Sequence, residues 1–125
     1  MLADSPVCAT IAVKDLDVAK KFYGETLGLK DPKEDQAGVL FKSGGGSAIY
    51  IYQSEFAGTN KATYAAWNVS DVEAIVKELK DKGIEFNTFD MPGVTWEGDI
   101  AVMGPMKAAW FSDPDGNILN VVSGM

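Results

Sequence analysis

The chain resembles itself, and this internal repeat constrains its fold more than any other feature. A first stretch begins at Cys8 and reads CATIAVKDLDVAKKFYGETLGL, and a second begins at Tyr64 and reads YAAWNVSDVEAIVKELKDKGI. Each is a short alternating strand followed by an Asp, an amphipathic helix and a Gly. The shared order of these signals predicts two tandem copies of one structural unit.

The start and the end of each predicted helix carry matching residues. Asp15 and Asp71 are suited to accept hydrogen bonds from the free amides of a first helical turn. Gly28 and Gly83 fit the left-handed conformation that often ends a helix. Apolar residues recur at helical spacing between these signals, so each helix is expected to pack one face against a sheet.

Short strands are expected after each helix. Their expected positions are about 29–33, 38–43 and 47–53 in the first copy and about 84–88, 106–112 and 117–123 in the second. Residues 89–105 have no counterpart of that length in the first copy. We expect a long loop there, of the kind that often closes over a ligand.

One βαβββ unit is too small to bury both faces of its sheet. Its helix covers one face, and the other face needs the sheet of a second unit. The sequence therefore predicts an α+β fold in which two tandem βαβββ modules have curved mixed sheets that enclose a cleft. We expect one domain over 1–125, with module one at about 6–54 and module two at about 62–123. Pairing of the modules within one chain or across a dimer stays open.

The composition excludes several kinds of chemistry. The chain has no histidine, which excludes an imidazole base or ligand, and its single cysteine excludes an internal disulfide and a thiolate zinc cluster. A net charge of −7 makes nucleic acids and anionic membranes poor partners. We see no signal peptide and no apolar run long enough to span a membrane, and we expect a cytoplasmic protein.

Three segments together point to a known family. They are VKDLDVAKKFYGETLGL at 13–29, VSDVEAIVKELKDKGIEF at 69–86 and WFSDPDGNILNVV at 110–122. With these segments the chain resembles the vicinal oxygen chelate superfamily, which includes glyoxalase I, bleomycin resistance proteins and extradiol dioxygenases. The resemblance covers nearly the whole chain. It implies paired βαβββ modules around a cleft, and often a homodimer whose cleft takes one module from each chain.

The resemblance also implies where a divalent metal would lie. In the superfamily's enzymes each module supplies one ligand from its opening strand and one from its closing strand. These positions fall at Cys8, Tyr50, Tyr64 and Asn120, and metal-binding relatives usually have glutamate where this chain has Asn120. None of the four is a carboxylate or an imidazole, the groups that such a site needs. We therefore expect neither a metal nor another cofactor.

The expected cleft combines aromatic rings with neutral hydrogen-bonding groups. This mixture is typical of a pocket for a small organic molecule, and aromatic faces also suit organic cations, which an acidic chain attracts. The expected cleft residues are Cys8, Thr10, Tyr50, Tyr52, Tyr64, Asn68, Trp96, Met103, Trp110 and Asn120. We predict a metal-free, small-molecule-binding protein of the glyoxalase/bleomycin resistance type, dimeric, with an aromatic or cationic ligand.

Two alternatives stay open. One is a metal-dependent lyase, isomerase or dioxygenase of the same superfamily with ligands outside the usual four positions. The other is a metal-free enzyme whose general base is Glu97 or Asp99, the carboxylates that flank Gly98 beside Trp96. The side chain of Asn120 has two possible roles. It could hydrogen-bond neighbouring strands together, or it could point into the cleft. An amide that points into the cleft without a hydrogen-bond partner costs about 1–3 kcal/mol of stability.

Overall fold

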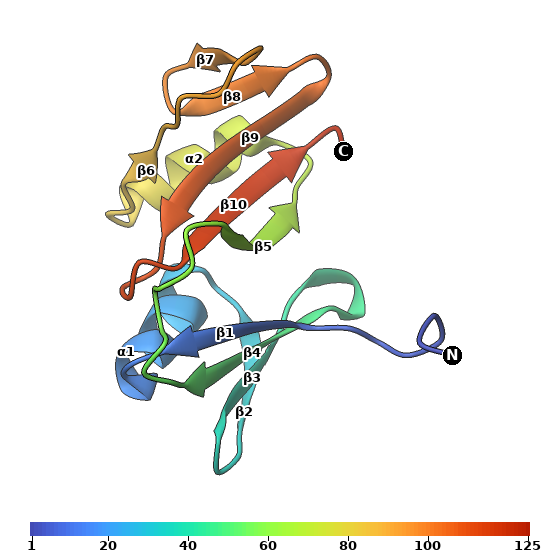
Figure 1. Cartoon of the computed structure of the whole chain (residues 1–125), viewed down its shortest axis with the longest axis vertical. Coiled ribbons are helices and arrows are strands. Elements are labelled where there is room, and N and C mark those ends of the chain that lie inside the picture. The colour runs from blue at the N-terminus through green and yellow to red at the C-terminus, as the bar shows by residue number, and fades with distance from the viewer.

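The computed structural model describes all 125 residues and shows two units, each a sheet with a helix against one face (Figure 1). Module one begins with an edge strand and a short helix that ends in a π-helical turn. Its elements are β1 (Ala9–Val13), α1 (Leu16–Lys21), η1 (Phe22–Thr26), β2 (Lys30–Glu34), β3 (Gly38–Lys42), η2 (Gly44–Gly46) and β4 (Ala48–Gln53).

Module two repeats this order with additional strands. Its elements are β5 (Thr63–Asn68), α2 (Val72–Asp81), β6 (Phe86–Asn87), β7 (Thr95–Glu97), β8 (Ile100–Met103), β9 (Met106–Ser112) and β10 (Ile118–Ser123). The strand order is β1-β4-β3-β2 in the first sheet and β5-β10-β9-β8-β7 in the second. The opening strand of each module runs parallel to its closing strand, and the other pairs are antiparallel. The predicted α+β fold of two related modules is confirmed.

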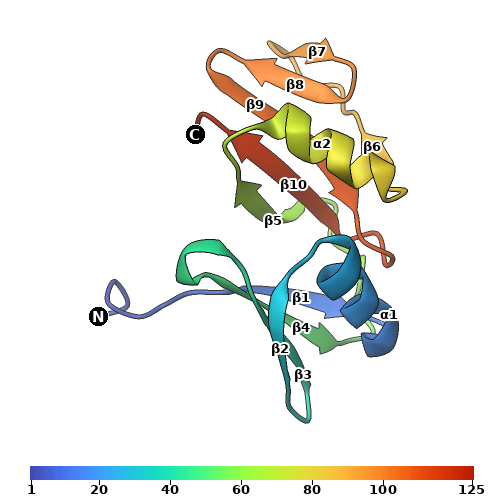
Figure 2. The ribbon, with the colours of Figure 1, turned by 180° about the vertical axis from the view of Figure 1, so that it is seen from behind.

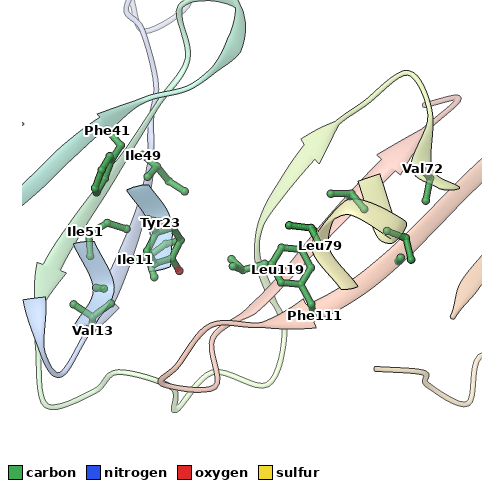
Figure 3. Packing of buried hydrophobic residues seen from close by; sticks show 14 of the residues in the cluster. Ile11, Val13, Tyr23, Phe41, Ile49, Ile51, Val72, Leu79, Phe111 and Leu119 are labelled. Carbon is green, nitrogen blue, oxygen red and sulfur yellow. The ribbon is translucent and has the colours of Figure 1, made fainter. Parts of the chain in front are cut away.

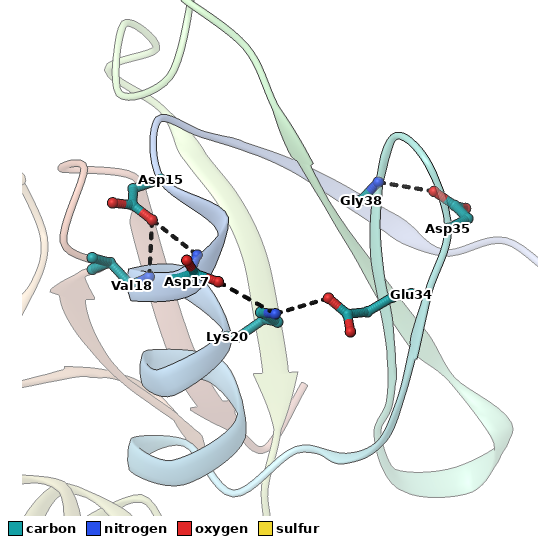
Figure 4. Close-up of polar contacts among 7 residues, drawn as sticks. All are labelled: Asp15, Asp17, Val18, Lys20, Glu34, Asp35 and Gly38. Atoms are coloured by element: carbon teal, nitrogen blue, oxygen red, sulfur yellow. Dashed lines mark hydrogen bonds and ion pairs between the residues drawn. The ribbon is translucent and has the colours of Figure 1, made fainter.

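Both helices begin where the sequence predicts. The Asp15 carboxylate accepts hydrogen bonds from the amides of Asp17 and Val18, and Asp71 accepts one from Ala74. Figure 4 shows the Asp15 cap together with Lys20, whose ammonium lies 3.4 Å from Asp17 and 2.8 Å from Glu34. Lys20 thus ties the exposed side of α1 to β2.

Residues 89–105 are not the single long loop that we expected. They contain the β7–β8 hairpin, which extends the second sheet, and Gly98 takes a φ of 64° at its turn. The expected strand at 84–88 shrinks to β6, which pairs with one end of β9 while β8 pairs with the other end. Burial of Ile100 and Ala101 explains why this stretch joins the sheet. The place next to β9 is therefore shared by β6 and β8, and β7 forms the edge beyond β8.

The modules lie side by side, with β1 of one next to β5 of the other (Figure 1). Figure 2 shows α1 and α2 on the same side of the molecule. We call the opposite side of each sheet its helix-free face. The two helix-free faces of one chain therefore look out on the same side and do not face each other. No helix of the chain is long and apolar enough to cross a membrane.

The hydrophobic core lies on the helix side of both sheets. It takes alternate residues of the strands, with Ile11 and Ile51 packed near Tyr23 in module one and Leu119 and Phe111 packed near α2 in module two (Figure 3). Alternation along each strand leaves the residues between them for the helix-free face. The position of the core therefore determines which side chains are available to a ligand.

The turn between β9 and β10 connects the two modules. Asp113 accepts a hydrogen bond from the Tyr23 hydroxyl, and both side chains are buried. The Asn117 amide donates to the carbonyl of Ala12 at 2.8 Å and accepts from the backbone amide of Gly58 at 3.1 Å. This part of the motif that carries the family resemblance is thus structural, since it joins the modules.

Candidate functional site

Strand pairing places several expected cleft residues on the helix-free face of module two. Asn120 of β10 lies between Ala66 of β5 and Trp110 of β9. Trp96 lies opposite Ala101 on β8, which lies opposite Ala108 on β9. Asn68 shares the face with Ala66 by alternation, and Met103 shares it with Ala101. Tyr64 lies at an irregularity of β5, where Thr63 pairs with Ile118 and Ala65 with Leu119, and it packs against the hydrophobic core. The structure thus fixes the side of the sheet for Trp96 and Met103, which the sequence left open.

Three aromatic rings gather on this face. The ring centroids of Trp96 and Trp110 lie 6.1 Å apart with the planes tilted by 56°. Phe89 meets Trp110 edge-to-face at 5.7 Å and 89°. Such geometries suit the charge distribution of aromatic rings. Phe89, Trp96 and Trp110 form what we call the aromatic cluster.

A cavity of about 310 Å³ lies beside the aromatic cluster. This volume is at the lower end of the range for small-molecule sites. Its lining residues are Lys61, Ala62, Thr63, Phe89, Met91, Trp110 and Ile118. Of these, Trp110 alone is among the cleft residues expected from the sequence. Phe89 and Met91 come from the segment between β6 and β7, whose path over the sheet no local pattern indicates.

Asn120 carries the one buried side-chain polar atom that has no hydrogen-bond partner. It is 8% exposed, and its Oδ1 atom is buried and has no partner. Leaving a buried acceptor unpaired costs about 1–3 kcal/mol. The amide does not tie strands together, and its burial next to Trp110 favours the alternative that it belongs to a ligand site.

The remaining expected residues lie on the helix-free face of module one. Thr10 pairs with Tyr50, and Tyr52, two residues further along β4, stacks on Tyr50 with ring centroids 6.3 Å apart. Cys8 is exposed just before β1. The structure therefore brings the expected cleft residues together in two groups, one on each sheet, rather than in one group within a single chain.

The Tyr50 hydroxyl is hydrogen-bonded to a carboxylate. It donates to Asp35 at 2.9 Å, and partial desolvation together with that carboxylate raises the pKa of Tyr50. Asp35 also accepts from the backbone amides of Ala37 and Gly38, and Figure 4 shows the bond from Gly38. These two bonds and that of Tyr50 lower the pKa of the carboxyl. A phenol with a raised pKa is a poor metal ligand at neutral pH.

The four positions that the family uses for a metal do not fit one here. Within one chain, Cys8, just before β1, and Tyr50 belong to module one, and Tyr64 and Asn120 belong to module two. The donors are an exposed thiol, two phenols and a neutral amide, and nowhere do three or more His, Cys, Asp or Glu side chains gather as a metal-binding group. Divalent ions of this family's type require carboxylates or imidazoles.

Glu97 and Asp99, the candidates for a general base, lie away from the aromatic cluster. Asp99 forms an ion pair with Lys80 of α2, on the helix side of the sheet. Glu97 follows Trp96 on β7, so alternation points it to the opposite face, and its charge contributes to a raised pKa of Lys107. Neither carboxylate approaches the cavity described above.

A second cavity, of about 300 Å³, lies on the helix side where the modules meet. It is lined by Leu27 and Gly28 of module one and by apolar residues of module two, including Trp67. The Trp67 indole donates to Ser43 at 3.2 Å, and Lys82 donates to the Thr26 carbonyl at 3.2 Å, both across the junction. No expected cleft residue lines this cavity.

Comparison with known proteins identifies the family. The model of the Glyoxalase/Bleomycin resistance protein/Dioxygenase superfamily matches residues 6–121. The chain belongs to this superfamily. Its family is thus the one that the three sequence segments resemble. Among curated protein sequences none matches the chain.

Solved structures share the fold across nearly the whole length. A glyoxalase family protein from Enterococcus faecalis is 20% identical with a TM-score of 0.71, covering 98% of this chain and 99% of that one. The fosfomycin resistance protein FosX from Listeria monocytogenes is 17% identical with a TM-score of 0.72 (98% and 94%). TnmS3, an antibiotic binding protein from Streptomyces sp. CB03234, is 21% identical with a TM-score of 0.63 (96% and 97%). At these identities the likeness shows the superfamily fold alone.

Proposed function

We propose that this superfamily member is a metal-free binding protein for a small, flat aromatic molecule. The observation that carries the proposal is the aromatic cluster beside the 310 Å³ cavity on the helix-free face of module two. Aromatic walls with a few neutral polar groups are typical of sites that bind organic ligands by stacking. The net charge of −7 favours a neutral or cationic ligand over an anionic one.

In this proposal the site is complete only in a homodimer. The helix-free face of module one exposes Thr10 and Tyr52 and has no facing sheet within the chain. Module one of a second copy, placed over module two, would supply Cys8, Thr10, Tyr50 and Tyr52 as the opposite wall of a cleft. That the protein acts in the cytoplasm, and without nucleic acid or membrane partners, stays a prediction.

The fold of TnmS3, an antibiotic binding protein, is compatible with this proposal, since the two chains align over nearly their whole lengths. FosX, a fosfomycin resistance protein, has the same fold, so the fold by itself does not decide between functions. The donor chemistry of Cys8, Tyr50, Tyr64 and Asn120 favours binding without a metal.

The proposal is tested by a thermal-shift screen of the full chain against aromatic compounds, with and without a chelator. A binder at one hundred times its dissociation constant should stabilise the fold by about 2.7 kcal/mol. We expect stabilisation that chelation leaves unchanged. Stabilisation that requires a stoichiometric divalent metal would instead support the metal-dependent enzyme and overturn this proposal.

A further inference from the structure

We infer that Asn120 selects the ligand by accepting a hydrogen bond from it, and that the Trp110 indole is a movable cover over Asn120. The inference rests on the proposed function and names the chemical class of its ligand. That class is a flat aromatic molecule with an N–H or O–H donor on its edge.

Asn117, three residues before Asn120, is an asparagine with a structural role and serves as a comparison. Its side chain is fully buried, donates to Ala12 and Asp113 and accepts from Gly58. Asn120 is nearly as buried, yet its Oδ1 has no partner. An unpaired acceptor destabilises the free protein, so a role outside folding is the physical reason to keep it.

Trp110 lies over the strand that holds Asn120. The two residues are directly paired, Trp110 on β9 and Asn120 on β10. The indole Nε1 donates at 3.2 Å to Oγ1 of Thr63 on β5, on the far side of β10 from β9. The ring must therefore reach across β10 on the face that Asn120 occupies. This position separates the amide from solvent.

The hydrogen bond that holds the Trp110 indole in place is weak enough to be replaced by bonds to water. The Trp110–Thr63 hydrogen bond is exposed, so water competes for both groups. Trp110 also meets the rings of Phe89 and Trp96. Ile118, which lines the cavity, lies on the same face of β10 as Asn120. Movement of the indole would therefore extend the cavity from Ile118 to the unpaired oxygen.

A pair of isosteric probes tests the donor requirement. Indole and benzofuran have the same shape, but indole has an N–H where benzofuran has an oxygen. We expect the full chain to bind indole about tenfold more tightly, which is the size of one hydrogen bond to a buried acceptor. Titrations followed by ¹H–¹⁵N spectra should also shift the Trp110 indole resonance, identified from its absence in W110F. Equal affinity for the two probes would overturn the inference.

Variants test the hydrogen-bond acceptor Asn120 and the Trp110 cover separately. N120L should bring the indole-to-benzofuran affinity ratio close to one, while N120D, which keeps an oxygen acceptor, should retain the preference for indole. T63V removes the bond that holds Trp110, so it should raise the affinity for both probes a few-fold by making the open state more common. T95V, a matched change on the exposed strand β7, should behave as the wild type.

The outcomes are distinguishable from failure of the proposed function. If the wild type binds neither probe nor any other aromatic compound, the proposed function itself is wrong. If it binds aromatic compounds with no preference for a donor, or if N120L keeps the preference, the role of Asn120 is wrong. If T63V and T95V give the same affinities, the Trp110 cover is wrong.

Discussion

The hydroxyl of Tyr23 donates a 2.7 Å hydrogen bond to Oδ2 of Asp113, a residue 90 positions away in the other module. Tyr23 is fully buried, and burial together with the nearby Asp113 charge raises the pKa of its phenol, so it stays a donor across the accessible pH range. The same Asp113 also accepts from the Asn117 side chain and backbone amide. This bond joins the π-helical turn η1 of module one to the turn before β10.

Removing the Tyr23 hydroxyl should weaken the junction. Y23F leaves the Asp113 carboxylate short of one buried donor, so we expect the free energy of unfolding to fall by about 2 kcal/mol in urea denaturation. Y52F removes a hydroxyl from an exposed ring that makes no hydrogen bond and should change stability by less than about 0.5 kcal/mol. Equal effects of the two changes would show that the junction bond does not stabilise the fold.

Replacing Asn120 by Leu should stabilise the free protein. The change removes a buried acceptor without a partner, so we expect the free energy of unfolding to rise by about 1–3 kcal/mol. N117L is the matched comparison, and it should destabilise because it deprives Ala12 and Gly58 of their partner. The free energies of unfolding of both variants would be measured by urea denaturation without ligand. A loss of stability in N120L would mean that the amide is satisfied in solution.

The Asp35 turn should make stability depend on pH in the acid range. Hydrogen bonds from Ala37, Gly38 and Tyr50 lower the pKa of Asp35 from its ordinary 3.8. The folded-state pKa is then below the unfolded-state value, so the stabilisation is present above the unfolded-state pKa and is lost as the pH falls through the folded-state value. We expect the denaturant concentration at the unfolding midpoint of the wild type to decrease as the pH is lowered below about 4.

D35N keeps one acceptor oxygen but does not titrate, so its midpoint should fall less steeply over the same acid range. D4N, which changes an exposed carboxyl in the N-terminal segment, provides the control and should follow the wild type. Parallel curves for D35N and the wild type would show that Asp35 does not contribute to the acid sensitivity.

Dimer formation should couple the two helix-free faces. If module one of a second copy covers module two, Y52A should lower the affinity for an aromatic probe about tenfold although Tyr52 lies on the other sheet. F56A removes another exposed ring, in the connection between the modules, and should leave the affinity unchanged. Sedimentation equilibrium would report the assembly state, and a monomer that binds the probe with full affinity would contradict the proposed cleft.

The sequence predicts the repeat well because its signals are local. Asp15 and Asp71 cap the amides that follow them within three residues, and strand alternation separates the core from the helix-free face. The site is less predictable, since it depends on long-range pairing. Phe89 meets Trp110 through the path of an irregular segment, and the bond from Tyr23 to Asp113 joins residues that are 90 positions apart.

The chain between β6 and β8 forms an excursion that supplies part of the proposed site. It brings Phe89 and Met91 to the cavity and Trp96 to the aromatic cluster, and its strand β7 forms the edge of the second sheet that is farthest from β5. Insertions, deletions or substitutions within 88–99 would therefore change the residues that line the pocket, while the hydrophobic core and the junction between the modules keep their contacts.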